Sequence, residues 1–145
     1  MSYSRRELNL LLPALAAAAR ASAGENDTLA AKCYPFESLP AKTNPNTHNE
    51  SRQVFDGKSH SGCRLDMHIT TLAPGQMPHP PHTHPHDELV TIQNGTLEVT
   101  MAGDTSRVSP GSVIYVDGTK LHGWKNVGDS PAQYFVLAIG RTGEA

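Results

Sequence analysis

The sequence has few of the features that mark membrane, nucleic-acid-binding or disulfide-rich proteins. It contains 2 cysteines, Cys33 and Cys63, which form neither a Cys-x-x-Cys nor a zinc-knuckle pattern. No apolar run reaches the roughly 20 residues that a membrane-spanning helix needs. The formal net charge is −2 with no basic cluster, which argues against nucleic acid as a partner. No phosphate-binding glycine loop or serine-histidine-aspartate order is present, so kinase and hydrolase interpretations have no support.

Histidine, in contrast, is concentrated at one place. Residues 79–86 hold four of the 8 histidines, and an acidic pair follows directly. If this stretch is extended, its side chains alternate between two faces, so His82, His84 and Glu88 share one face. Two imidazoles and a carboxylate are a metal site that lacks a ligand, and His122 lies far enough downstream to supply it from another strand. The alternative is a solvated, proline-rich and histidine-rich loop without a metal.

The N-terminus has the three parts of a secretory signal peptide. Arg5 and Arg6 precede a short apolar run, and a small-x-small site ends at Ala23. An amphipathic helix would have to include Pro13, at a cost of about 3 kcal/mol. We therefore predict that residues 1–23 are a signal peptide cleaved near Ala23, which makes the mature chain periplasmic or secreted, bacterial and not membrane-bound. The arginine pair favours the twin-arginine route, and the general secretory route stays open.

After the signal peptide, the sequence predicts an arm, a barrel and a tail. Residues 24–59 are polar and rich in Pro and Asn, and we expect an irregular arm that wraps the domain or pairs with a partner subunit. Across residues 60–140, short alternating segments are separated by turn signals such as Asn94-Gly95, which is typical of an all-β sandwich or small barrel. No helical periodicity stands out, and residues 141–145 are a tail. The predicted strands cover 63–70, 88–93, 97–101, 105–108, 112–116, 122–127 and 133–139.

Two motifs in this region resemble those of the cupin superfamily. The first has the order glycine, histidine pair, glutamate, glycine (Gly75, His82, His84, Glu88, Gly95). The second has a proline-glycine turn and an H-x-x-x-N ending (Pro110, Gly111, His122, Asn126). The chain departs from the usual pattern by one extra residue before the histidine pair and by Asp117, which stands near the position where many cupins carry proline. Both departures concern loops and no ligand.

The resemblance implies a double-stranded β-helix, which is a jelly-roll barrel, and usually a homodimer. Carried over by position, His82, His84, Glu88 and His122 would bind one divalent transition metal inside the barrel. Fe, Mn, Ni, Cu and Zn all suit this ligand set, and the sequence does not choose among them. Glu88 could also act as an acid or base if it moves off the metal.

Several other residues are candidates for the surroundings of the metal. Trp124 lies two residues after a predicted ligand and shares its face, so it either packs in the core or lines a pocket. Tyr115, Tyr134 and Phe135 are candidates for one wall of that pocket, which we expect to be apolar with few polar groups. We expect His86 to lie beside the ligands or to face solvent, but not to bind the metal, and we expect His68 at an interface or at the surface.

Three functions remain open at this point, because the fold alone does not give function. The first is a metal-dependent oxygenase or oxidase that acts on a small organic molecule and is similar to the quercetinase-like or oxalate-like single-domain cupins. The second is a non-catalytic periplasmic protein that binds a metal or a small ligand. The third is a non-redox, metal-dependent isomerase or lyase.

Overall fold

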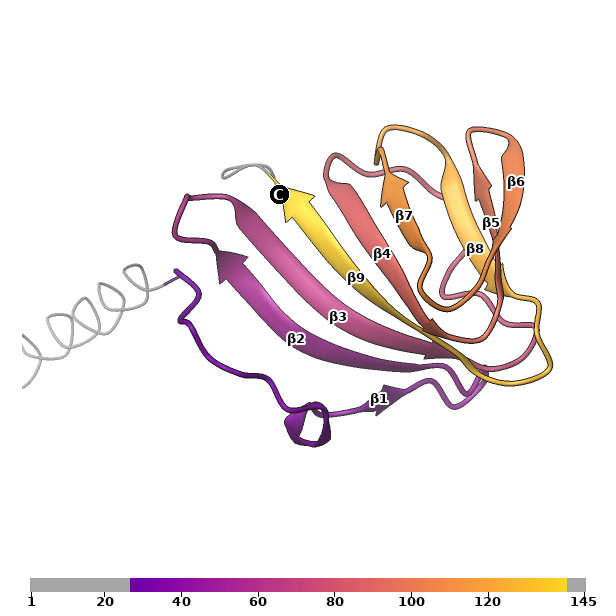
Figure 1. Cartoon of the computed structure of the whole chain (residues 1–145), viewed down its shortest axis with the longest axis horizontal. Coiled ribbons are helices and arrows are strands. Elements are labelled where there is room, and N and C mark those ends of the chain that lie inside the picture. Colours follow the sequence, from indigo (N-terminus) through magenta and orange to yellow (C-terminus); the bar gives the residue numbers. More distant parts are fainter. Residues whose placement is uncertain (1–26, 141–145) are drawn as a thin grey trace, which may run out of the picture.

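The computed structural model describes residues 27–140, whose regular secondary structure is almost entirely β-strand (Figure 1). The predicted signal peptide, 1–23, and the predicted tail, 141–145, lie outside the described residues. The all-β prediction is confirmed, and every strand predicted between residues 63 and 139 is present, with its ends shifted by at most two residues. The elements are η1 (Phe36–Ser38), β1 (Lys42–Thr43), β2 (Glu50–Lys58), β3 (Arg64–Leu72), β4 (Asp87–Asn94), β5 (Leu97–Met101), β6 (Asp104–Val108), β7 (Val113–Val116), β8 (His122–Asn126) and β9 (Ala132–Gly140).

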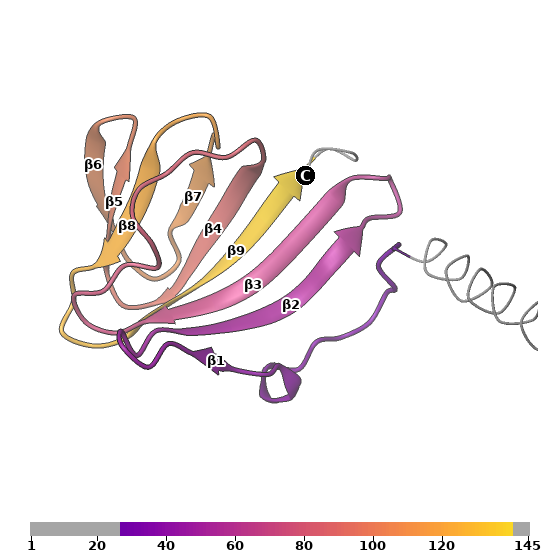
Figure 2. The same cartoon turned by 180° about the vertical axis from the view of Figure 1, so that it is seen from behind.

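The strands form two antiparallel sheets in a jelly-roll arrangement. The larger sheet has the order β1-β2-β3-β9-β4-β7, and the smaller has the order β6-β5-β8. The smaller sheet lies next to the β4–β7 end of the larger one, whereas β2 and β3 extend away from it (Figures 1 and 2). The larger sheet is therefore covered at one end and open at the other.

The segment Glu50–Lys58 differs from the sequence-based prediction. We placed it in the irregular arm at 24–59, but it forms the 9-residue strand β2. The strand was missed because its large apolar residues, Val54 and Phe55, are adjacent and do not alternate. The pairing with β3 shifts register between Gln53 and Phe55, and such an irregularity interrupts the period of two on which strand prediction depends.

The rest of the arm, residues 27–41, runs along β2, beginning with a short parallel pairing between Thr28 and Lys58 and continuing with side-chain contacts. Leu39 is buried, and its carbonyl oxygen accepts a hydrogen bond of 2.6 Å from Nη1 of Arg52. The ring of Tyr34 lies 5.5 Å from the ring of Phe55, measured between centroids. Of the two roles expected for the arm, the structure shows the one in which it wraps its own domain.

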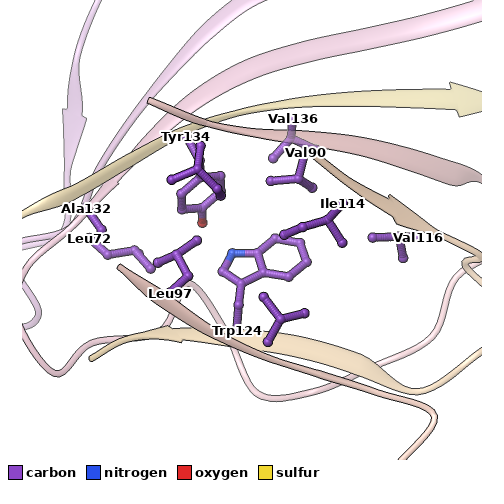
Figure 3. Packing of buried hydrophobic residues seen from close by; sticks show 11 residues of the cluster. Leu72, Val90, Leu97, Ile114, Val116, Trp124, Ala132, Tyr134 and Val136 are labelled. Carbon is purple, nitrogen blue, oxygen red and sulfur yellow. The ribbon is translucent and has the colours of Figure 1, made fainter. Parts of the chain in front are cut away.

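The hydrophobic core fills the space between the two sheets (Figure 3). Alternation along β4 and β5 turns every second side chain inward, and Val90 and Leu97 are both 0% exposed. Complete burial of such a side chain contributes about 1.5–3 kcal/mol. The core also contains Leu72, Ile92, Val99, Ile114, Val116, Trp124, Ala132, Tyr134 and Val136.

The two cysteines are not bridged. Cys33 is exposed, and the thiol of Cys63 donates to the carbonyl oxygen of Gly140 at 3.2 Å. Among residues 27–140, no helix is long and apolar enough to cross a membrane.

Candidate metal centre

The loop between β3 and β4 carries the first two predicted ligands and is held in place by backbone hydrogen bonds. His82 and His122 exchange two of them, with N···O distances of 3.0 and 3.1 Å, and so join the loop to β8. The amide of His84 donates to the carbonyl oxygen of Gly118 at 2.8 Å. His82 and His84 thus lie in a pinned loop and not in the extended strand from which we inferred their shared face.

Asn126, the last residue of the second motif, holds the start of the same loop. Its side-chain amide is fully buried and donates to the carbonyl oxygens of Leu72 at 3.0 Å and Ser130 at 2.8 Å. Its own amide and carbonyl bond to Gln76 and Gly75. One buried side chain therefore fixes the end of β3, the beginning of the loop and the turn after β8.

The loop and β8 bring three imidazoles together. One ring nitrogen from each of His82, His84 and His122 lies within 4.8 Å of the other two. The ring centroids are 4.7–5.1 Å apart. His122 is 0% exposed, and the other two are half-buried. Three imidazole nitrogens that converge in this way are a donor set that a transition-metal ion can take.

Hydrogen bonds set the tautomers of two of these rings. Nδ1 of His84 lies 2.8 Å from the carbonyl oxygen of His86, and Nδ1 of His122 lies 2.8 Å from that of Lys120. A carbonyl oxygen only accepts, so Nδ1 donates and Nε2 keeps its lone pair. Both Nε2 atoms, together with Nδ1 of His82, are buried without a hydrogen-bond partner. Buried polar atoms are rarely unpaired, and these three fit a divalent transition metal.

Glu88 lies at the edge of this triad. Its residue exposure is 9%, and Oε1 is 3.6 Å from Nε2 of His84. Two ligand atoms at this separation can share one metal ion, because metal–ligand bonds are about 2.0–2.2 Å long. Oε1 is also 3.6 Å from Nε2 of His86, and His84, His86 and Glu88 form a second group of converging ligand atoms. His86, predicted to lie beside the ligands, therefore contacts the glutamate directly.

Gly118 makes the approach of the two loops possible. A Cβ at this position would overlap the carbonyl oxygen of His86 and both Nδ1 and the carbonyl oxygen of His84. Any side chain here would displace the segment that presents His84. No local pattern marks this residue, since the need for glycine comes from a contact between distant segments.

A cavity of about 530 Å³ lies beside Glu88, on the inner face of the open half of the larger sheet. We expected an apolar pocket with few polar groups, but most lining residues are polar or charged, and the surface that they present to the cavity is mixed. The cavity is lined by Lys42, Thr43, Asn44, Asn49, Glu50, Ser51, Gln53, His68, Thr70, Pro78, His79, Glu88, Trp124, Tyr134 and Val136.

His68 lines this cavity and does not lie at the surface as expected. Burial lowers the pKa of His68, and the negative charges of Asp66 and Glu88 oppose that shift. Thr70 lies two residues further along the same face of β3 and also lines the cavity. The alternation of polar residues in the predicted strand 63–70 was the available signal, and it was read as a solvent-facing side.

Trp124 has both of the roles that we considered. Its ring belongs to the core, stacks on His122 with centroids 6.1 Å apart, and lines the cavity. In Figure 3 the indole nitrogen lies on the side of the Tyr134 hydroxyl, and the two rings meet at 88°. Burial raises the pKa of Tyr134, so this phenol stays protonated.

Tyr115 and Phe135 are not brought to the cavity. Tyr115 is 58% exposed, and its hydroxyl donates to Asp87 at 3.0 Å on the outer face of the larger sheet. This hydrogen bond raises the pKa of Tyr115. Phe135 pairs across the sheet with Ile69 and Thr91, whose side chains also point outward. In β7 and β9 the inward positions belong to the alternate residues, so both candidates were assigned to the wrong face.

Comparison with known proteins supports the fold assignment. The family model Cupin_2, a cupin domain, matches residues 68–139. No curated protein matches the sequence. An RmlC-like cupin from Shewanella frigidimarina has a TM-score of 0.61 and 14% identity, covering 78% of this chain and 95% of that chain. KdgF from a Halomonas species has a TM-score of 0.64 and 17% identity, covering 78% of this chain and 97% of that one.

The polyketide cyclase RemF from Streptomyces resistomycificus is similar too, with a TM-score of 0.62 and 16% identity, covering 80% of this chain and 88% of that one. At these identities the likeness shows the fold alone. The described strands therefore share the jelly-roll fold of these cupin structures, and residues 68–139 match the cupin-domain model.

Proposed function

We propose that the protein binds one divalent transition metal through His82, His84, His122 and Glu88 and uses it to act on a small organic molecule. The observation that carries the proposal is the set of three buried ring nitrogens that converge without hydrogen-bond partners. An oxygenase or oxidase of the quercetinase-like kind is the activity that we place first. In that role the metal supplies the redox chemistry, and the protein positions the substrate and excludes water.

The cavity indicates what kind of substrate the protein accepts. Lys42 from β1, Ser51 from β2 and Thr70 from β3 offer hydrogen-bond donors, while Trp124 offers an aromatic surface at the inner end. A volume of about 530 Å³ lies within the usual range for small-molecule sites. This lining fits a small hydroxylated or carboxylated molecule better than a fully apolar one.

A non-redox isomerase or lyase is the second candidate, because the same cavity holds acid–base groups. Glu88, His68 and the Tyr134 hydroxyl all border it, so proton transfer to a bound molecule needs no oxidant. One of the similar solved structures is a sugar phosphate isomerase from Silicibacter pomeroyi, with 18% identity. The non-catalytic binding protein is the outcome if neither activity is found.

The test is metal analysis followed by activity screens on the same preparation. We expect one Fe or Mn per chain and oxygen consumption with a small polar organic substrate. Stoichiometric zinc with proton exchange or isomerisation, and without oxygen uptake, would favour the second candidate. A protein that binds no Fe, Mn, Co, Ni, Cu or Zn when dialysed against each would overturn the metal-dependent function.

The matched control is a second histidine variant. His82→Ala removes a predicted ligand, whereas His60→Ala removes an exposed histidine from the turn between β2 and β3. We expect only the first to lose activity. Equal loss in both variants would show that the activity does not depend on the centre.

A homodimer also remains a prediction, and the outer face of the larger sheet is the surface on which we would look for it. One row of paired positions across this face is apolar throughout, from Phe55 through Met67, Leu137 and Leu89 to Tyr115. The arm covers the Phe55 end, whereas Tyr115 is 58% exposed. Light scattering of the purified protein, compared with Tyr115→Lys, measures whether a second copy covers this end.

The location is likewise proposed from the sequence. Expression of the full chain in a bacterial host should give a mature protein in the periplasm that begins after Ala23. Mass spectrometry of that fraction measures the cleavage site, and an Arg5→Lys/Arg6→Lys variant that is still exported would exclude the twin-arginine route.

A further inference from the structure

Two hollows lie next to each other on the inner face of the larger sheet. The first is the cavity of about 530 Å³ beside Glu88, and the second has a volume of about 210 Å³. Among the described residues, His68 and Glu88 line both hollows. The wall of the smaller one is completed by Arg64, Asp66, His86, Ala138 and Gly140. The two shared residues therefore form the boundary between the hollows.

Strand β3 shows where this boundary lies. Thr70, His68, Asp66 and Arg64 are alternate residues of the strand, so their side chains lie on one face of it. Thr70 borders only the large cavity, whereas Asp66 and Arg64 border only the small hollow. His68 stands between them and borders both. The two hollows therefore follow one another over the same face of β3, and they are divided at His68.

The neighbouring strand β9 contributes little to the division. Its inward residues decrease in size from Val136, which borders the large cavity, to Ala138 and Gly140, which border the small hollow. Ala138 pairs with Glu88 of β4. The larger side chains at the division are thus His68 from β3 and Glu88 from β4. Glu88 already belongs to the proposed metal centre, whereas His68 has no part in it.

The volumes indicate that the small hollow is not a binding site of its own. Sites for small molecules usually measure about 300–1,000 Å³. The large cavity falls within this range, and the small hollow, at about 210 Å³, falls below it. If the two were joined, the large cavity would extend past Glu88 and would have room for a longer molecule. The side chain at position 68 therefore decides how far a bound molecule can reach.

We propose that His68 is a specificity-determining residue that limits the length of the molecule bound in the large cavity. Its imidazole closes the cavity toward the small hollow, so the protein accepts compact polar molecules with one ring and rejects molecules that extend past Glu88. The inference rests on the proposed binding of a small organic molecule in this cavity, and it adds the size of that molecule.

The experiment compares two probes of different length by calorimetric titration of the purified protein. The short probe is para-hydroxybenzoate, and the long probe has a second benzene ring between the hydroxyl and the carboxylate. The unmodified protein should bind the short probe and bind the long probe much more weakly. His68→Ala should bind the long probe at least about 10-fold more tightly than the unmodified protein does. The affinity for the short probe should change less than that for the long probe.

The matched control is His79→Ala, which removes the same side chain from the wall of the large cavity. His79 does not line the small hollow, so this variant should still reject the long probe. His68→Phe keeps a ring at the division and should reject it too. His68→Ala/Ala138→Leu fills the small hollow and should reverse the gain of His68→Ala. Circular dichroism checks that each variant is folded, and His68→Ser replaces His68→Ala if the latter is not.

The results separate this proposal from the metal-dependent function, because elemental analysis of the same samples measures the metal. A protein that holds no metal but shows the expected change in His68→Ala loses only the metal-dependent function. Equal affinity for the long probe in the unmodified protein and in folded His68→Ala would overturn the length limit, whatever the metal content. An equal gain in His79→Ala, no reversal by Ala138→Leu, or no binding of either probe would overturn it as well.

Discussion

The larger sheet presents two different inner faces, although it is one continuous set of strands. Where the smaller sheet covers it, its inward side chains are aliphatic and fully buried, such as Val90 and Val116. Where β2 and β3 extend away from that cover, the inward side chains are polar and line a cavity. Whether the inner face of a strand is polar or apolar therefore depends on whether another sheet packs against it. Facing inward does not by itself make a side chain apolar.

Three rows of paired residues show where the change occurs. Each row begins with polar residues in β2 or β3 and ends with apolar ones in β4 or β7. The rows are Ser51-Thr70-Tyr134-Ile92, Gln53-His68-Val136-Val90-Ile114 and Asp66-Ala138-Glu88-Val116. Glu88 is the acidic residue nearest the covered end, and it lies at the boundary between core and cavity. A metal ligand at this position is shielded from bulk water on one side and accessible to a small molecule on the other.

The largest expected effect is at the covered end. Ile92→Ala removes a side chain of β4 that is 2% exposed, and we expect unfolding to become easier by about 2–5 kcal/mol. The same truncation at the open end, Gln53→Ala, should cost less than about 0.5 kcal/mol, because that residue is exposed. Urea denaturation measures both. Similar losses in the two variants would contradict the distinction between the two ends.

Two substitutions between valine and threonine, which have nearly the same shape, test the comparison further. Val90→Thr places a hydroxyl among aliphatic side chains and should cost about 1–3 kcal/mol, because nothing there accepts its hydrogen bond. Thr70→Val makes the opposite change in the wall of the cavity and should stay within about 0.5 kcal/mol. The measurement is the free energy of unfolding of each variant, compared with that of the unmodified protein. A larger decrease in Thr70→Val than in Val90→Thr would reverse our assignment of the covered and open ends.

A substitution at Gly118 tests the boundary between the core and the cavity, where the predicted metal ligands lie. Gly118→Ala pushes a methyl group into the segment that carries His84 and His86, so metal affinity should fall by about 10- to 100-fold. Gly128→Ala is the matched control, because a Cβ there makes only ordinary contacts, the nearest at 3.4 Å to Asn126. Metal titration of both variants checks the expectation, and equal affinities would mean that the loop adapts to the added methyl.

The smallest effect concerns pH. Burial lowers the pKa of His68 below its ordinary value of 6.5, so the unfolded chain takes up this proton at a higher pH than the folded protein does. Protonation of His68 should therefore destabilise the folded state as the pH decreases below 6.5. Above that pH, His68 should have no such effect. We expect the stability difference between mildly acidic and mildly alkaline solution to shrink in His68→Gln. An unchanged or steeper pH dependence in that variant would place His68 in solvent.

The local predictions succeeded where one strand or one turn carries the signal. Alternation in β3 to β9 depends only on whether a segment is half-buried, so these strands were predicted within two residues of their ends. The convergence of His82, His84 and His122 was predicted from the chemistry of metal ligands, whereas metal binding itself stays a prediction. The prediction failed for β2, because a register shift interrupts the alternation of apolar and polar side chains. It also failed for Tyr115 and Phe135, because an error of one residue in that alternation moves a side chain to the opposite face of the sheet.

The sequence by itself determined the all-β class, the order of the strands and the identity of the side chains that converge, because periodicity and ligand chemistry are local properties of the chain. The tertiary structure decided how those side chains converge and what they face. Hydrogen bonds between the β3–β4 loop and both β8 and Gly118 align the three imidazoles. The absence of a described strand opposite β2 and β3 makes the neighbouring cavity polar. Both depend on contacts between segments far apart in the chain, which no local pattern encodes.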